Sequence, residues 1–462
     1  MPASRWWPAA LFLTSALCLV VRLIDLDGKS VFADEMSSFT FARMNWTAFW
    51  RVVTSSEANM ALYYVLLRFW IRIGDSVWFI RFLSVILALA TVPVIYDIGT
   101  KLFSRYTGLL AALLFSLNVY HISYSQAARG YTLAVLLVSL SCLYFVKSIE
   151  SLDTRISAAY VTSSTAALYS HFFAGFVLLA QFVSLFFLRS RVATIRQLRL
   201  MVVIAVLGSP LLVFAAIHKT GPLAWVQPPS GKDVYHFLTY LTGSGLKFGI
   251  CLFALVVVGR EWWQRTVASD PKQNSTWPFV FLTLWFVLPL GIALALSHWK
   301  PVFSPRFLMI SLPAFLLLTS QGLLAIGPRW PRRLVVLILL VSLATALPSY
   351  YRRPGFEDWN AVNNFLAQKV QANDTIFVDP AYRDVFEFTY HHSGRTLPTR
   401  KVIIDLGLKT DDGERSDRIW IISCHPTHTA QDPIPPLPEQ YVPGPTTKFP
   451  GIEVLQYVKS AG

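Results

Sequence analysis

Residues 77–103 have the sequence VWFIRFLSVILALATVPVIYDIGTKLF, and the apolar part at 78–98 is long enough to cross a membrane as a helix. A transmembrane helix needs about 20 predominantly apolar residues. The rest of the chain has the same character, since its 462 residues are 54% hydrophobic and 14% aromatic with only 14% charged. This composition excludes an ordinary soluble domain and predicts a polytopic α-helical membrane protein.

Working outward from this run, we expect about eleven transmembrane helices. The first is a retained helix rather than a signal peptide, because no small-residue cleavage site follows it. An additional helix at 61–74 is expected to be interfacial or re-entrant, because Arg68 and Arg72 interrupt its aromatic sequence. The predicted spans are 7–24, 78–98, 107–121, 131–147, 156–170, 172–188, 200–217, 246–260, 278–297, 306–326 and 333–348.

The basic residues predict the orientation. A formal net charge of +14 would indicate nucleic-acid binding in a soluble chain, but membrane proteins accumulate Lys and Arg in cytoplasmic loops. We therefore expect no nucleic-acid partner. The loops richer in Lys and Arg lie on the same side of the membrane as the N-terminus, which predicts that the N-terminus is cytoplasmic. The first loop, 25–77, and the C-terminus are then outside the cytoplasm. The basic residues of the inner loops include Lys101, Arg105, Lys147, Arg155, Arg189, Arg191, Arg196, Arg199, Arg260, Arg265, Arg329, Arg332 and Arg333.

The composition changes near residue 355. Apolar residues at helical spacing follow at 356–370, and short apolar runs at 375–379, 401–405, 418–423 and 454–458 predict strands. We expect a membrane domain at 1–350, with 25–77 as its catalytic loop, and a small extracytoplasmic α/β domain at 355–462. The sequence contains neither a dinucleotide fingerprint nor a phosphate-binding P-loop, so nothing predicts a nucleotide cofactor.

An adjacent acid pair, Asp34 and Glu35, lies in VFADEMSSF at 31–39, just beyond the first span. Three other polar clusters fall in loops on the same side of the membrane: YSQAARGY at 124–131, YSHFF at 169–173 and HWKPVFSPRF at 298–307. The loops after odd-numbered spans thus converge on one face.

Arg129 and Arg306 each stand at the start of an apparent helix, and Pro305 marks the second start. The helix dipole disfavours a cation at this end and favours an anion. The pair therefore predicts an anionic ligand bound by the guanidinium groups and free backbone N–H groups. Lys300 is close enough in sequence to assist, and Arg81 repeats the pattern at the second span. Snorkelling to lipid headgroups is the simpler explanation for each cation alone.

Carboxylates facing such cations at a membrane surface fit group transfer from a lipid phosphate. One acid would remove a proton from an acceptor hydroxyl, and the cations would stabilise the departing phosphate. A flippase or transporter of lipid-linked sugars would also need outer cations. That class places ionisable groups near the middle of the membrane, whereas here they gather at one face.

The chain resembles the multi-spanning C-type (GT-C) glycosyltransferases of the protein mannosyltransferase-like group. The similarity extends over about residues 5–350 and is carried by the acid pair, NMALYY at 59–64, the 77–103 run, SQAARGY at 125–131, SHFF at 170–173 and SPRFLMISLP at 304–313. It implies a GT-C-like fold with an extracytoplasmic tail. It also implies transfer of a monosaccharide, with inversion, from a polyprenyl phosphate such as undecaprenyl phosphate to a hydroxyl acceptor at the outer face of a bacterial inner membrane.

The resemblance implies that Asp34 is the base and that Glu35 lies beside it in the active site. Two departures concern the substrate. In the usual HPPLYY pattern, Asn59 replaces the His and both prolines are missing. In the usual SQEARGY pattern, Ala127 replaces the acid, whereas Gln126, Arg129 and Tyr131 remain. The donor sugar, the acceptor and the use of a divalent metal ion are left open.

Three further residues are candidates for substrate binding. His171 follows Ser170 at an outer turn and is placed to orient a sugar or acceptor, although a lone interfacial His is commonly structural. Tyr63 and Tyr64 would line a sugar or prenyl path, although interfacial aromatic residues are also routine membrane anchors.

Overall fold

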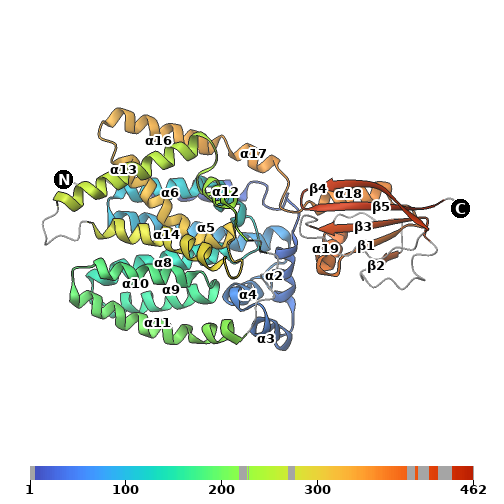
Figure 1. Ribbon diagram of the computed structural model, residues 1–462, viewed down its shortest axis with the longest axis horizontal. Helices are drawn as coiled ribbons and strands as arrows, with labels where there is room; N and C mark the ends of the chain where they lie inside the picture. The colour runs from blue at the N-terminus through green and yellow to red at the C-terminus, as the bar shows by residue number, and fades with distance from the viewer. Residues whose placement is uncertain are drawn as a thin grey trace. The chain divides into compact units, whose positions relative to one another are not determined.

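A computed structural model shows a chain divided into two compact units (Figure 1). The membrane unit comprises Met1–Ile24 and Met44–Tyr350, and the C-terminal unit comprises Asp25–Arg43 and Tyr351–Gly462. The start of the first loop thus groups with the C-terminal unit, whereas the sequence prediction kept all of 25–77 in the membrane domain. The structure describes residues 6–217, 226, 228–268, 276–392, 401–403, 416–424 and 440–460.

The membrane unit is a bundle of packed helices. α8 lies within it and packs against α5 and α9, and α15 packs against α6, α13 and α14. Its elements are α1 (Trp6–Leu23), α3 (Trp46–Ser55), η1 (Ala58–Met60), α4 (Ala61–Trp70), α5 (Val77–Leu102), α6 (Arg105–Leu117), α7 (Val119–Ser125), α8 (Tyr131–Glu150), α9 (Thr154–Ser170), α10 (Ala174–Ser184), η2 (Leu185–Phe187), α11 (Arg191–Ile217), α12 (Gly231–Thr242), α13 (Leu246–Ala268), α14 (Trp277–Leu296), η4 (Pro305–Ser311), α15 (Leu312–Leu324), α16 (Arg329–Ala344) and α17 (Leu347–Arg352).

The number of helices able to span a membrane is lower than the sequence predicted. Seven helices of the described residues are long and apolar enough, and nine if the bent pairs α6–α7 and α12–α13 each form one span. The predicted spans at 156–170 and 172–188 fall on α9, with 17 residues, and α10, with 11. Both are shorter than the about 20 residues that a membrane crossing usually needs. The described residues therefore support seven to nine spans rather than eleven.

The break between α6 and α7 turns the chain toward the candidate site. Asn118 begins α7, accepting a hydrogen bond from the His121 N–H at 3.0 Å, and the two helices meet at 61°. A break frees backbone carbonyls that need donors in a membrane interior. The fully buried Arg22 supplies them, donating to the carbonyls of Ser116 at 3.0 Å and Phe115 at 3.3 Å. Arg22 therefore stabilises the bend.

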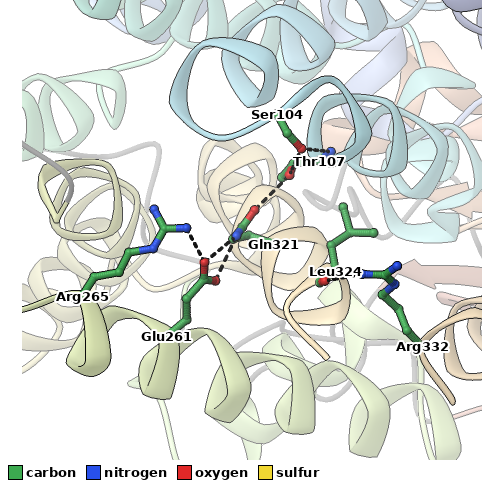
Figure 2. A network of polar contacts seen from close by, with 7 residues as sticks. All are labelled: Ser104, Thr107, Glu261, Arg265, Gln321, Leu324 and Arg332. Carbon is green, nitrogen blue, oxygen red and sulfur yellow. Dashed lines mark hydrogen bonds and ion pairs between the residues drawn. The ribbon is translucent and has the colours of Figure 1, made fainter. Parts of the chain in front are cut away.

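A polar network joins α6, α13 and α15 (Figure 2). The Thr107 hydroxyl donates to Gln321 Oε1 at 2.9 Å, and Gln321 Nε2 donates to both Glu261 oxygens at 2.9 Å. Glu261 also pairs with Arg265, one turn further along α13. Each polar side chain of this network thus has a partner, which offsets the cost of its burial.

Gly322 allows α13 and α15 to pack closely, and we expect Gly322→Ala to destabilise the membrane unit. A Cβ at this position would lie 1.9 Å from the Ala254 carbonyl oxygen, which forces the helix backbones apart. Such overpacking costs about 1–3 kcal/mol. Thermal unfolding of the detergent-solubilised protein measures the effect. Gly259→Ala on α13 is the matched control, because its Cβ would meet nothing within 4 Å. Equal melting temperatures for the two variants would contradict the prediction.

The C-terminal unit is a small mixed α/β fold. Its five strands have the order β2-β1-β3-β5-β4, with β1 parallel to β2 and β3, and β5 antiparallel to β3 and β4. The predicted helix and four strands are confirmed, and the structure adds β4 and α19. The elements are α2 (Ala33–Arg43), α18 (Trp359–Lys369), β1 (Thr375–Val378), η5 (Pro380–Tyr382), α19 (Arg383–His392), β2 (Lys401–Ile403), β3 (Arg418–Cys424), β4 (Tyr441–Phe449) and β5 (Ile452–Lys459).

Candidate functional site

The acid pair begins helix α2 in the C-terminal unit. Asp34 and Glu35 occupy its first turn, where the helix dipole favours negative charge. Glu35 is fully buried, whereas Asp34 is only partly buried. Of the two carboxylates, Asp34 is therefore the more accessible to solvent.

In the membrane unit, the two predicted phosphate cations meet around one histidine. Arg129 lies in the turn just before α8, and Arg306 is the second residue of η4. Both guanidinium groups act electrostatically on His171, which ends α9. Three segments that are distant in the sequence thus bring their polar ends together.

His171 has a defined tautomer. Its Nδ1 accepts a hydrogen bond from the Phe173 N–H at 3.2 Å, so the proton of the neutral ring is on Nε2. The side chain is 1% exposed, and within the part of the chain that the structure describes Nε2 has no hydrogen-bond partner. Burial, together with Arg129 and Arg306, lowers the His171 pKa to about 3. The residue therefore presents a neutral N–H donor beside two cations.

This pKa shift predicts a pH effect on stability. His171 stays neutral in the folded protein down to about pH 3, whereas an unfolded histidine binds a proton near pH 6.5. The unfolded state therefore binds more protons between these values, and stability is lost as pH falls below about 6.5, by up to about 1.4 kcal/mol per pH unit. We expect His171→Asn, which keeps an acceptor for the Phe173 N–H, to lose less thermal stability than the wild type between pH 7 and pH 5. Equal losses would contradict the shifted pKa.

Aromatic side chains enclose this cluster. The Tyr131 ring lies 6.2 Å from the His171 ring between centroids, and the Arg129 guanidinium lies 5.7 Å from the centroid of Tyr131. Phe307, next to Arg306, packs on His171 with centroids 5.2 Å apart. The Tyr131 hydroxyl is buried and has no hydrogen-bond partner among the described residues. Two buried polar atoms, Tyr131 Oη and His171 Nε2, thus remain available to a ligand.

The first loop contributes a second layer to the cluster. Asn59 Oδ1 accepts the Phe172 N–H at 2.8 Å and so ties η1 to the His171 turn. Tyr63 and Tyr64, on α4, are fully buried rather than anchored at a membrane surface. The Tyr64 hydroxyl donates to Glu57 at 3.0 Å, and its charge partners include Arg129. The two tyrosines therefore line the cluster from the side of α4.

Gln126 is engaged by the protein itself. Its Nε2 donates to the carbonyls of Arg22 at 3.0 Å and Ile24 at 2.7 Å, and its Oε1 accepts from the Tyr350 hydroxyl at 2.8 Å. These bonds fix the end of α1 beside the turn that carries Arg129. The geometry thus gives Gln126 a supporting position.

The remaining predicted cations are placed differently. Arg81 is buried in the second turn of α5, and Lys300 is exposed after α14.

Two residues near the cluster were not predicted from the sequence, Glu57 and Tyr120. The Tyr120 hydroxyl donates to the Pro305 carbonyl beside Arg306. Neither stands in a recognisable motif, so only the folded contacts reveal them. Among the residues that the structure describes, no three or more His, Cys, Asp or Glu side chains are grouped so that they could hold a metal ion.

Chemically, the cluster is suited to an anion. Two guanidinium groups and a neutral N–H donor converge, and the burial of Arg129 and His171 strengthens their interactions relative to water. Arg129 lies just before α8, and Arg306 lies in the first turn of η4. This set of donors suits an anion such as a phosphate group.

Part of the chain matches a known protein family. Residues 59–214, less than half of the chain, match the family model of dolichyl-phosphate-mannose-protein mannosyltransferases. No curated protein matches the chain in sequence. The matched region contains Asn59, α4 and the turns that carry Arg129 and His171.

Solved structures show the same fold. ArnT from Cupriavidus metallidurans bound to undecaprenyl phosphate is 14% identical with a TM-score of 0.58, and the match covers 98% of each chain. AglB from Archaeoglobus fulgidus, in complex with an inhibitory peptide and a dolichol-phosphate, is 10% identical with a TM-score of 0.52, covering 90% of this chain and 69% of that one. Mycobacterial arabinofuranosyltransferase AftD is 13% identical with a TM-score of 0.51, and the match covers 100% of this chain and 42% of the AftD chain. The predicted GT-C fold and resemblance are confirmed.

Proposed function

We propose that this GT-C-fold protein is an inverting glycosyltransferase that moves one sugar, a hexose or pentose, from a polyprenyl-phosphate carrier to a hydroxyl acceptor. The observation that carries the proposal is the convergence of Arg129 and Arg306 on the neutral His171. This cluster supplies charge and hydrogen bonds to a lipid phosphate at the ends of helices.

The carrier class is supported by the fold relatives. The ArnT structure contains undecaprenyl phosphate, and the AglB structure contains a dolichol-phosphate. Both ligands combine a long isoprenoid chain with one phosphate group. A phosphate cluster in an apolar helical bundle suits such a ligand, because the lipid tail stays in the bilayer while the phosphate meets cations.

The proposed reaction is a single displacement at the anomeric carbon. The acceptor oxygen forms a bond to this carbon while the bond from the carbon to the phosphate oxygen breaks, so the configuration inverts. Asp34 takes the proton of the acceptor hydroxyl. Arg129 and Arg306 stabilise the charge on the departing lipid phosphate. The proposal keeps Lys300 and Arg81 as additional phosphate-binding cations and Glu35 as the neighbour of Asp34 in the active site. It makes no use of a metal ion.

The proposal places the site outside the cytoplasm, in a bacterial inner membrane. The support is the distribution of Lys and Arg, which predicts a cytoplasmic N-terminus and external loops at 25–77, 124–131, 169–173 and 298–307. A lipid-linked donor is used at this face because nucleotide sugars are confined to the cytoplasm. The acceptor would be a glycan, a lipid or a protein.

Transfer from a panel of donors tests the function. Membranes that contain the protein are given radiolabelled polyprenyl-phosphate monosaccharides, and label is measured in water-soluble glycan, lipid and protein fractions. Label that leaves the carrier in a protein-dependent way supports a transferase. A carrier that crosses the bilayer with its sugar intact would instead identify a flippase and overturn the proposal.

A further inference from the structure

The helix that carries Asp34 is fastened to the C-terminal unit at its start. The backbone N–H of Ala33 donates to Glu357 Oε2 at 3.0 Å, and the same oxygen accepts from Trp359 Nε1 at 2.7 Å. Glu357 is 4% exposed, so its carboxylate is committed to the interior of this unit. Ala33, the residue just before the proposed base, is therefore bonded to a residue more than 320 positions later in the sequence.

Two neighbouring contacts extend this attachment. The Ser30 hydroxyl accepts the Asn360 N–H at 2.9 Å and donates to Asp358 Oδ1 at 3.4 Å. The Phe32 and Phe356 rings pack with centroids 5.2 Å apart. The segment that enters α2 thus runs beside the segment that enters α18, and each contributes groups to the other.

The body of α2 is held as well, through α19. The Thr40 hydroxyl donates to Asp384 Oδ2 at 3.1 Å, and the rings of Phe39 and Phe388 meet edge to face at 5.7 Å. Because α2 is attached both at its first residue and nearly two turns later, it cannot rotate about its axis without breaking these contacts. These contacts therefore set the face of α2 from which the Asp34 side chain projects.

A carboxylate at this position has a specific physical role. The first N–H groups of a helix have no partner within the helix, and a side chain just before the helix usually accepts one of them. Phe32, which precedes α2, has no acceptor in its side chain. Glu357 supplies the missing acceptor from a distance, and its negative charge suits the positive end of the helix dipole.

We propose that Glu357 is a positioning residue for sugar transfer, which holds helix α2 so that Asp34 points to the acceptor hydroxyl. This inference rests on the proposed function for its catalytic consequence. It gives the C-terminal unit a role in the chemical step, distinct from recognition of the acceptor.

Hydrogen exchange tests the attachment without any assay of activity. In the full-length detergent-solubilised protein, Glu357→Ala is expected to speed backbone exchange in residues 31–43 by about 3- to 30-fold, the effect of losing a helix cap. Glu357→Gln keeps an acceptor oxygen and should restore most of the protection. Glu387→Ala, which removes a half-exposed carboxylate on α19, is the control. Unchanged exchange in Glu357→Ala would overturn the proposal.

Steady-state kinetics test the catalytic consequence. A misdirected base should lower kcat by about 10- to 100-fold while KM for the lipid donor stays within about twofold, because the phosphate cations are untouched. Glu357→Gln should recover most of kcat. An unchanged kcat, or a loss that appears only in KM, would overturn the positioning role. If the wild type transfers no sugar, the proposed function fails, whereas the exchange experiment still reports on the attachment.

Gly451 provides a second variant that leaves Glu357 itself intact. Its φ of +70° is unfavourable for other residues, and a Cβ there would lie 2.6 Å from the Phe356 oxygen and 3.1 Å from Glu357 Cγ. Gly451→Ala should therefore shift Glu357 and give the same faster exchange in residues 31–43 and the same loss of kcat. A folded Gly451→Ala protein with the wild-type exchange rate in residues 31–43 and the wild-type kcat would contradict the proposal.

Discussion

Replacing Asp34 by Asn is expected to reduce sugar transfer by about 10²- to 10⁴-fold, the usual contribution of a general base. Asparagine has nearly the same shape but does not take the acceptor proton. The hydrogen bond from the Ala33 N–H to Glu357 at the start of α2 does not involve the substituted side chain. The measurement is the initial rate of label transfer at saturating donor, together with the affinity for sugar-free polyprenyl phosphate, which should stay near the wild-type value.

Two comparisons make this result specific. Asp75→Asn changes an exposed carboxylate in the same predicted outer loop and should leave the rate unchanged. Glu35→Gln changes the buried neighbour, which we expect to affect stability more than the chemical step. A fully active Asp34→Asn protein combined with an inactive but folded Glu35→Gln protein would assign the base to the other member of the pair.

The sequence revealed the helical membrane fold because its signal is local. A long apolar run predicts a span wherever it occurs. The difference in span number concerns α9 and α10, whose sequences predicted spans but whose helices of 17 and 11 residues are shorter than the about 20 residues that a crossing usually needs.

In the C-terminal unit, the strand at Tyr441–Phe449 was missed for a definable reason. Its sequence, YVPGPTTKF, contains two prolines and a glycine, which argue against a strand in most positions. The structure places β4 at the edge of the sheet, where one side of the strand forms no ladder and proline is tolerated. Its register is also irregular between Pro443 and Thr446.

The site was predictable in part. The positions of Arg129 and Arg306 at helix starts could be inferred from neighbouring residues, whereas their meeting at His171 depends on the packing of α8, α9 and η4. The grouping of α2 with the C-terminal unit depends on the bond between Ala33 and Glu357, which no local pattern reveals. Long-range polar contacts of this kind are what the sequence alone left undetermined.

Replacing Arg129 by Met is expected to lower kcat/KM for the lipid donor by about 10²- to 10³-fold, the typical effect of removing one donor to a developing anion. Methionine retains much of the volume beside Tyr131 but has neither charge nor N–H groups. Affinity for sugar-free polyprenyl phosphate should also fall, because the same guanidinium contacts the phosphate before and after transfer.

The lysine variant shows whether geometry matters in addition to charge. Arg129→Lys keeps a positive charge but loses the planar fork that binds two phosphate oxygens, so it should recover only part of the activity. Lys232→Ala, at an exposed position in a predicted outer loop, is the control for loss of one positive charge. If Arg129→Met binds polyprenyl phosphate as tightly as the wild type, Arg129 is not a phosphate ligand. The convergence on His171 would then be a structural feature of the bundle, and the cations of the proposed mechanism would have to be sought elsewhere.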